Sequence, residues 1–179
     1  MLNPIPSEVD VAVIGAGSAG LPAFRAAREH TDRVILIERG PHGTTCARVG
    51  CMPSKLLIAA AEAAHGMEIA PGFGIHPGSI SINGEAVMER VRRERDRFVG
   101  FVLDGVDRID PEQKISGQAR FVEDSRLEIG NSQVRAGRVV IASGTSPAIP
   151  DFLEQVRDRV SVNDDVGEWK TLPDSVAVV

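Results

Sequence analysis

A glycine-rich hexapeptide between two apolar segments restricts the fold of this chain more than any other feature. It reads Gly15-Ala16-Gly17-Ser18-Ala19-Gly20 and fits the pattern G-x-G-x-x-G. Apolar residues at Val9 and Val11–Ile14 predict a buried parallel strand, and the alanine-rich stretch through Glu29 predicts a helix. A second apolar run, residues 33–37, ends in Glu38. The sequence therefore predicts a βαβ unit at the start of an α/β dinucleotide-binding fold with a parallel sheet and flanking helices.

The spacing of these residues predicts a nucleotide site. In this pattern Gly15 permits the tight turn, Gly17 lets the backbone approach a pyrophosphate, and Gly20 allows the helix to pack closely on the strand. The helix start, at Ser18 and Ala19, offers free N–H groups to phosphates. Glu38 stands where an acid accepts hydrogen bonds from ribose hydroxyls. A purely structural glycine turn is the alternative, and these residues alone do not separate NAD from FAD.

Length, composition and charge narrow the class of protein. A chain of 179 residues predicts one domain, or one domain and a fragment. Its 42% apolar and 25% charged residues are typical of a soluble globular protein, and its net charge of -5 argues against nucleic-acid binding. No segment approaches the roughly 18 consecutive apolar residues of a membrane helix, and residues 1–10 do not resemble a secretion signal. We expect a cytoplasmic protein that does not bind membranes.

The only two cysteines, Cys46 and Cys51, follow the nucleotide fingerprint as a C-x4-C pair. In a reducing compartment such cysteines are more often catalytic than structural. Residues 50–64 predict a helix, which places Cys51 near its start, where the helix dipole favours a thiolate. Cys46 then lies one irregular turn earlier, within reach of a disulfide. The pair predicts a redox-active dithiol, and two unrelated buried cysteines are the alternative.

The cysteine segment resembles the redox-active disulfide motif of the class I pyridine nucleotide–disulfide oxidoreductases, which hold FAD in their first dinucleotide fold. It reads Cys46-Ala47-Arg48-Val49-Gly50-Cys51-Met52-Pro53-Ser54-Lys55, and the resemblance covers essentially the entire chain. Thr44 stands where the family usually has a second glycine, which is expected to alter the loop over the pyrophosphate. Arg48 stands where asparagine is common, and its cation is expected to lower the pKa of the thiols.

This resemblance implies roles for individual residues. Cys51 is the inner thiol that faces the flavin, Cys46 is the outer thiol that exchanges with substrate, and Lys55 lies near the flavin N5 atom. Backbone near Ala119 touches the adenine. The cofactor-binding residues implied are Gly15, Gly17, Ser18, Ala19, Gly20, Glu38, Gly43, Thr44, Thr45, Lys55, Ala119, Ser143 and Gly144. The four histidines have no ligand spacing, so we predict that each is exposed or hydrogen-bonded and that the chain holds no metal site.

The remainder of the chain predicts one long helix and a small sheet. Residues 85–109 carry an imperfect helical stripe of apolar residues, and Asn83 is the expected N-cap. Residues 115–121, 126–129 and 133–141 predict an inserted antiparallel meander that returns to the main sheet. Residues 138–147 resemble the family's apolar strand followed by an A-T-G motif, with Ser143 in place of threonine.

The sequence predicts two regions. Residues 1–150 form the FAD-binding domain with the redox-active disulfide. Residues 151–179 form a linker and, at Val176–Val179, the first strand of a second, NAD(P)-binding domain. No second glycine fingerprint follows that strand, and we therefore expect the N-terminal part of a longer enzyme.

The resemblance also implies an activity. Electrons pass between NAD(P)(H), FAD, the Cys46–Cys51 disulfide and a small dithiol or disulfide substrate, or a lipoyl-carrying protein. Pro53-Ser54-Lys55 favours the dihydrolipoamide dehydrogenase branch, with dihydrolipoamide as substrate. A mercuric or glutathione-type reductase is the alternative, and a non-catalytic FAD-binding module or apo fragment is another. The intact protein is expected to be a homodimer.

Overall fold

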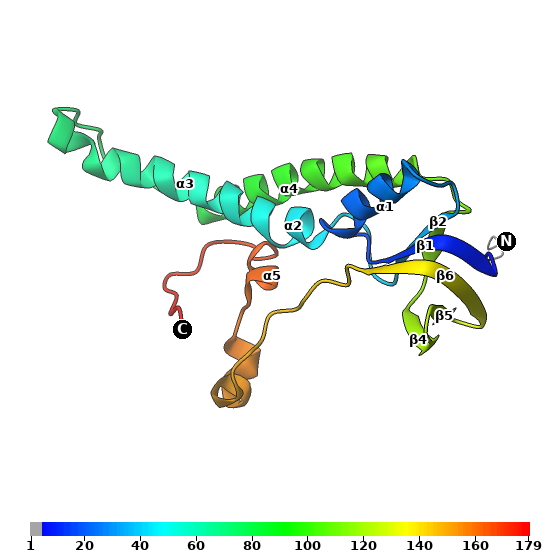
Figure 1. Ribbon diagram of the computed structural model, residues 1–179. Helices are drawn as coiled ribbons and strands as arrows, with labels where there is room; N and C mark the ends of the chain where they lie inside the picture. The colour runs from blue at the N-terminus through cyan, green and yellow to red at the C-terminus, as the bar shows by residue number, and fades with distance from the viewer. Residues whose placement is uncertain (1–4) are drawn as a thin grey trace. The chain divides into compact units, whose positions relative to one another are not determined.

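The computed structural model describes residues 5–179 as an α/β protein whose internal contacts divide into two units (Figure 1). Unit 1 comprises Met1–Thr45 and Val99–Ser146, and unit 2 comprises Cys46–Phe98 and Pro147–Val179. A six-stranded sheet with flanking helices forms in unit 1, parallel in one part and antiparallel in the other. The predicted fold class is confirmed.

The sheet has the strand order β3-β2-β1-β6-β5-β4. Its first four strands are parallel, and β4, β5 and β6 form the antiparallel meander that the sequence predicts. The strands are β1 (Glu8–Ile14), β2 (Val34–Glu38), β3 (Lys114–Ser116), β4 (Ala119–Glu123), β5 (Arg126–Ile129) and β6 (Ser132–Ile141).

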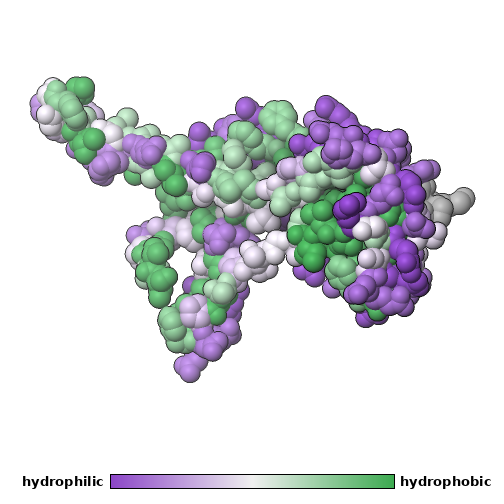
Figure 2. Space-filling model, in the orientation of Figure 1, coloured by the Kyte–Doolittle hydropathy of each residue, from purple (hydrophilic) through white to green (hydrophobic). Residues whose placement is uncertain are grey.

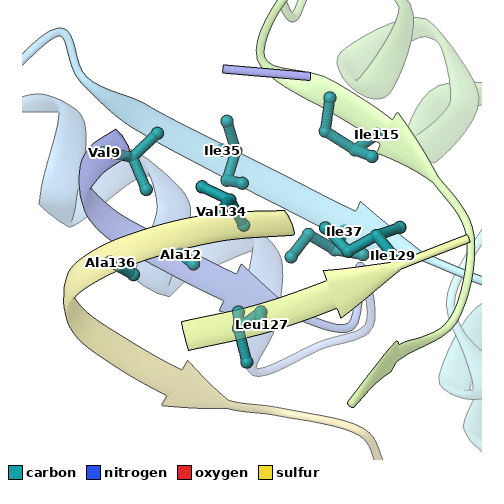
Figure 3. Close-up of a cluster of buried hydrophobic side chains, with 9 residues drawn as sticks. All are labelled: Val9, Ala12, Ile35, Ile37, Ile115, Leu127, Ile129, Val134 and Ala136. Carbon is teal, nitrogen blue, oxygen red and sulfur yellow. The ribbon is translucent and has the colours of Figure 1, made fainter. Parts of the chain in front are cut away.

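Two hydrophobic clusters explain why the central strands are apolar throughout. In β2, Ile35 and Ile37 belong to one cluster, whereas Val34 and Leu36 belong to the other, because successive side chains of a strand point to opposite faces. Figure 3 shows the first cluster, which also contains residues of β3, β5 and β6. The second cluster includes α1 (Gly20–Arg28) and Val106, from the end of α4 (Gly84–Asp107). The parallel strands are therefore buried on both faces.

The predicted strand over residues 115–121 is wrong as a single element. It forms two strands, β3 and β4, that lie at opposite edges of the sheet. Gly117 separates them with φ 153°, a value that side chains rarely adopt, and its N–H donates to the Glu38 carbonyl at 2.9 Å. The chain can turn here because glycine has no Cβ.

Unit 2 is mainly helical. Asn83 caps α4 as predicted, because its Oδ1 accepts a hydrogen bond of 3.0 Å from the Ala86 N–H. Pro53 is the one residue of α3 that is buried among those described, and apolar side chains stay exposed along α3 and beyond its end (Figure 2). α4 continues into unit 1, and α2 (Thr45–Arg48) has its first residue there. The other helices are α3 (Cys51–Ile69), η1 (Ala70–Phe73), η2 (Asp151–Arg159) and α5 (Asn163–Val166).

The C-terminal segment of unit 2 packs against α3 and α4. The Arg92 guanidinium donates to the Trp169 carbonyl, and Arg95 forms an ion pair with Glu168. A Cβ on Gly167 would lie 3.5 Å from the Cβ of Pro53. These contacts hold residues 167–169 beside the start of α3.

Val176–Val179, which the sequence predicts as the first strand of a second domain, form no regular element in this chain. A strand needs a neighbour that pairs with its backbone N–H and C=O groups, and the described part of unit 2 contains no strand. Among residues 5–179, no helix combines the length and hydrophobicity that a membrane span requires.

Candidate functional site

The carboxyl ends of three neighbouring strands define the candidate cofactor site of unit 1. Ile14 of β1 pairs with Ile37 of β2 on one side and with Ile141 of β6 on the other. The residues that follow these three strands therefore lie at one edge of the sheet. In open α/β sheets, ligands bind outside this edge.

Gly15 and Gly20 are required by packing within the protein. A Cβ on Gly20 would lie 1.7 Å from the Gly15 carbonyl oxygen. Gly15 has φ 104°, and its Cβ would lie 2.2 Å from the Ala142 carbonyl oxygen. Both distances are far shorter than a van der Waals contact, so the turn, the start of α1 and the end of β6 fit together only with glycine at both positions.

Gly17 differs, because nothing in the described protein demands glycine there. No atom lies within 4 Å of the Cβ that could be built on it, and its φ is outside the positive range. Ser18 and Ala19, which follow it, are exposed, and no side chain caps the start of α1. Open space beside uncapped helix N–H groups fits the diphosphate of a dinucleotide.

Glu38 connects the glycine turn to the loop after β2. Its Oε2 accepts a hydrogen bond of 2.7 Å from the Ala16 N–H, and its Oε1 accepts one of 2.8 Å from the Gly40 N–H. A carboxylate oxygen can accept more than one hydrogen bond. Glu38 therefore holds the two loops together and keeps capacity for ribose hydroxyls.

The loop over residues 39–45 contains two residues with positive φ. Gly43 is buried with φ 110°, and Thr44 has φ 59°. This left-handed conformation is unusual for a β-branched residue. It accounts for the glycine that is usual at this position in the resembling family, and it shows that Thr44 keeps the turn at some cost in strain.

His42 corrects the prediction that every histidine is exposed or hydrogen-bonded. Its Nδ1 atom is buried and has no hydrogen-bond partner among residues 5–179. Metal-ligand spacing in the sequence does not mark this residue. Its place in the loop between Glu38 and Gly43 was the available signal.

The remaining candidates of unit 1 also lie near the strand ends. The Gly117 N–H donates a hydrogen bond to the Glu38 carbonyl, at the carboxyl end of β2. This bond brings Ala119, two residues later at the start of β4, near the carboxyl ends of the parallel strands. The Ala142 N–H donates to the Ile14 carbonyl at 2.8 Å, and the exposed Ser143 follows directly. The structure thus brings together the glycine turn, Glu38, the start of β4, Ser143 and the residue after it, Gly144.

The other three candidates, Cys46, Cys51 and Lys55, belong to unit 2. Cys46 lies in the single turn of α2, and α3 begins at Cys51, as the sequence predicts. Cys46 is half-buried and Cys51 is exposed, and both are free thiols. The expected irregular turn before Cys51 is thus a short helix.

The two thiols are in contact. The Cys46 thiol donates a hydrogen bond to Cys51, and this bond, with burial and the charge of Cys51, raises the pKa of Cys46 above its ordinary value of 9.0. Lys55 lies near enough to oppose this shift through its charge. The predicted lowering of the thiol pKa by Arg48 is therefore wrong for Cys46. Sulfur atoms that share a hydrogen bond are close enough to form a disulfide after a small adjustment.

Metal-ligating side chains do not gather in the described part of the chain. Among residues 5–179, no three His, Cys, Asp or Glu side chains are placed to hold one metal ion.

Comparison with known proteins identifies the family. Residues 9–179 match the family model described as pyridine nucleotide-disulphide oxidoreductase. The chain is 36% identical to a mercuric reductase of Streptomyces lividans, over 95% of this chain and 37% of the relative. It is 32% identical to a dihydrolipoyl dehydrogenase of Chlamydia trachomatis, over 95% and 37%, and 30% identical to a glutathione reductase of Burkholderia cepacia, over 96% and 38%.

A solved structure shares the fold. The flavoprotein disulfide reductase RclA of Escherichia coli aligns with 79% of this chain and 29% of its own length, at a TM-score of 0.61 and 21% identity. The chain spans 27–39% of the length of the curated relatives that it matches. The chain belongs to the pyridine nucleotide–disulphide oxidoreductase family, whose members are flavoproteins that bind FAD and typically use NAD(P).

Proposed function

We propose that Cys46 and Cys51 are the redox-active dithiol of an FAD-dependent NAD(P)–disulfide oxidoreductase. The observation that carries this proposal is the hydrogen bond between the two thiols, at the start of α3 in a chain of this family. A pair in such contact can alternate between dithiol and disulfide with little movement of the backbone.

The two cysteines take different roles in this proposal. Cys46 exchanges with the substrate, and Cys51 is the leaving thiolate. The first turn of α3 supports that assignment, because a helix N-terminus stabilises a thiolate. A stabilised leaving group accelerates thiol–disulfide exchange.

When the cysteine pair starts as a disulfide, thiol–disulfide exchange with a substrate dithiol proceeds in two steps. A substrate thiolate attacks the Cys46 sulfur, the Cys46–Cys51 bond breaks, and Cys51 leaves as a thiolate. The second substrate thiolate then attacks the substrate sulfur bonded to Cys46, closes the substrate disulfide and releases Cys46, which takes up a proton. The substrate dithiol loses two electrons, and the cysteine pair gains them.

The cofactor site of unit 1 fits FAD. We assign the diphosphate to Gly17 and the start of α1, and the adenosine ribose to Glu38, because open space, free N–H groups and a carboxylate lie at one strand-end edge. FAD, when bound, supplies the two-electron chemistry that links the cysteine pair to NAD(P)(H). The remaining proposed contacts are Gly15, Ser18, Ala19, Gly20, Gly43, Thr44, Thr45, Lys55, Ala119, Ser143 and Gly144.

We propose a small dithiol as the substrate class, with dihydrolipoamide or a lipoyl-carrying protein first. Pro53-Ser54-Lys55 and the dihydrolipoyl dehydrogenase relative support this choice. A second candidate is mercuric ion reduction, which the mercuric reductases at 36% and 34% identity favour. The intact protein is proposed to act as a homodimer. Steady-state assays of it with dihydrolipoamide and with mercuric ion would distinguish these substrates.

The test is a visible absorption spectrum of the purified chain, reconstituted with FAD and titrated anaerobically with a dithiol. We expect a flavin spectrum that gains a long-wavelength band on reduction. The band should be lost in Cys51→Ser and retained in Cys46→Ser, because the two thiols have different roles. Failure to bind FAD would contradict the assigned cofactor site. If FAD binds but its absorption spectrum does not change when the dithiol is added, the chain is a non-catalytic FAD-binding module.

A further inference from the structure

The start of α3, which carries one thiol of the redox pair, has few contacts of its own with the rest of unit 2. Cys51 is exposed, and no side chain caps the helix N-terminus at Gly50. The first turn closes locally, because the Ser54 N–H donates to the Gly50 carbonyl at 3.2 Å. Pro53, two residues after Cys51, is the one residue of α3 that is buried among those described. The residues that cover Pro53 therefore decide how firmly this turn is held.

Gly167 covers Pro53 from the C-terminal segment. It is buried, and a Cβ built on it would lie 3.5 Å from the Cβ and 3.9 Å from the Cγ of Pro53. The same Cβ position lies 3.6 Å from Nη1 of Arg95, on α4. These are ordinary van der Waals distances. Gly167, Pro53 and the Arg95 guanidinium therefore meet at one point beside the first turn of α3.

An ion pair ties the C-terminal segment to α4 at this point. The Arg95 side chain is only 12% exposed, and its Nη1 donates to the carboxylate of Glu168, the residue after Gly167. On the same helix, the Arg92 guanidinium donates to the Trp169 carbonyl. A guanidinium with so little exposure is screened less by water than a surface charge, so its ion pair holds the segment more firmly than a surface pair would.

We propose that Arg95 and Glu168 are positioning residues for the redox-active dithiol. Their ion pair holds Gly167 against Pro53, which fixes the first turn of α3 and keeps the two thiols in contact. The inference rests on the proposed redox role of the cysteine pair and extends it to two charged residues that touch neither sulfur.

A firmly held turn favours the disulfide over the dithiol. Two thiols that are already in contact lose little conformational freedom when they form a bond, whereas a loose turn must first be ordered. Breaking the ion pair therefore disfavours the disulfide and raises the reduction potential of the pair. Coupling between two sites is reciprocal, so disulfide formation must in turn strengthen the docking of residues 167–169. A purely structural ion pair would change stability without this link.

The experiment measures the reduction potential of the cysteine pair in the 179-residue chain without FAD. The protein is equilibrated anaerobically with mixtures of reduced and oxidised dithiothreitol, and the thiols are then alkylated and counted by mass spectrometry. One oxidised dithiothreitol takes two electrons and two protons from the pair, while one S–S bond forms between the cysteines.

Glu168→Gln and Arg95→Gln should each lower the equilibrium constant for disulfide formation about fivefold. This raises the reduction potential by about 20 mV for a two-electron couple. The double variant should shift no further than the larger single shift, because both changes break the same ion pair. The Glu168 side chain is 64% exposed, so Glu168→Gln keeps the test valid if Arg95→Gln does not fold.

The reciprocal effect is read from Trp169. Acrylamide should quench its fluorescence less in the oxidised than in the reduced wild type, because the disulfide tightens the docked segment. Cys51→Ala, which forms no disulfide, should show equal quenching in oxidising and reducing buffer. Arg93→Gln and Glu154→Gln are the matched controls, since both remove an exposed charge of unit 2, and their potentials should equal that of wild type.

Two kinds of failure are distinguishable. A wild-type potential in both Glu168→Gln and Arg95→Gln would overturn the inference alone, as would an equal shift in the controls or equal quenching of Trp169 in the two redox states. A wild-type pair that forms no disulfide at any ratio of oxidised to reduced dithiothreitol would overturn the proposed redox role and this inference with it.

Discussion

The carboxylate of Glu38 accepts a hydrogen bond of 2.7 Å from the backbone N–H of Ala16, 22 residues earlier in the chain. The bond crosses from the end of β2 to the turn after β1. A residue that the sequence marks as a ribose ligand thus also shapes the loop that receives the diphosphate. The two parts of the candidate nucleotide site are therefore mechanically linked before any ligand binds.

Glu38→Gln should destabilise unit 1 as well as weaken FAD binding. The amide presents an NH2 group to one of the two backbone N–H donors, so one of two charge-assisted hydrogen bonds is lost. We expect a decrease of about 1–2 kcal/mol in the free energy of unfolding, measured with urea. Glu29→Gln, at an exposed position, is the control. Equal midpoints for the two variants would contradict the structural role of Glu38.

Gly20→Ala and Gly17→Ala should separate packing from ligand binding. The Gly20 variant places a Cβ 1.7 Å from the Gly15 carbonyl oxygen and should lose about 3 kcal/mol or more of stability, or fail to fold. The Gly17 variant meets no described atom within 4 Å and should unfold within about 0.5 kcal/mol of wild type. It should nevertheless bind FAD about tenfold more weakly. Unchanged FAD affinity in Gly17→Ala would place the diphosphate elsewhere.

Arg95→Gln should release the segment that contains Trp169. Burial of the Arg95 guanidinium lowers its pKa, but hydrogen bonds to Asp96 and Glu168 outweigh burial and raise it. Its side chain is only 12% exposed, so its loss leaves the docking of residues 167–169 unsupported. We expect a loss of about 1–2 kcal/mol and stronger acrylamide quenching of Trp169, the single tryptophan.

Arg93→Gln is the matched control for this experiment, because Arg93 lies on the same helix with a side chain 63% exposed. Its quenching should equal that of wild type. Equal quenching in Arg95→Gln would show that the ion pair does not hold the segment.

Cys51→Ala should make Cys46 more reactive at pH 8 in the reduced protein. The hydrogen bond to Cys51 is the largest cause that raises the pKa of Cys46, so its removal lowers that pKa and increases the thiolate fraction. Iodoacetamide should alkylate Cys46 several-fold faster than in wild type, as measured by mass spectrometry. Cys51→Ser keeps an acceptor oxygen and should show a smaller gain. Slower alkylation in Cys51→Ala would show that the Cys46 thiol is not the donor of this hydrogen bond.

The same pKa shift links the stability of the reduced protein to pH. A thiol whose pKa is higher in the folded than in the unfolded state stabilises the fold below the unfolded value of 9.0. That contribution is lost as the pH rises through the folded-state pKa. Denaturation midpoints of the reduced wild type should therefore fall more steeply with alkaline pH than those of Cys51→Ala.

The central part of the fold was predictable because its residues are locally unambiguous. Apart from Asp10 and Arg33, residues 9–14 and 33–37 are apolar on both faces, and a parallel sheet covered on both sides buries them. The glycines of the turn and the start of α3 at Cys51 were equally clear, since helix and turn signals are local. Contact between the two thiols followed from the spacing of the pair.

Other features depend on distant parts of the chain. Nothing in residues 115–121 reveals that β3 pairs with β2 while β4 pairs with β5 across the sheet. Val176–Val179 has the composition of a strand, but composition does not supply a pairing partner. The unpaired Nδ1 of His42 depends on what surrounds it, which no spacing rule reports.

The strand β6 pairs with β5 through its first residues and with β1 through its last, and Arg135 is in register with both Arg126 and Glu8. The β5–β6 hairpin is local in sequence, whereas the β1–β6 pairing joins residue 8 to residue 135. Closing so long a loop is entropically slow, so the meander should form first and then serve as the template on which β1 aligns. During synthesis on the ribosome, β1 therefore lacks this central partner until the segment up to residue 141 has emerged.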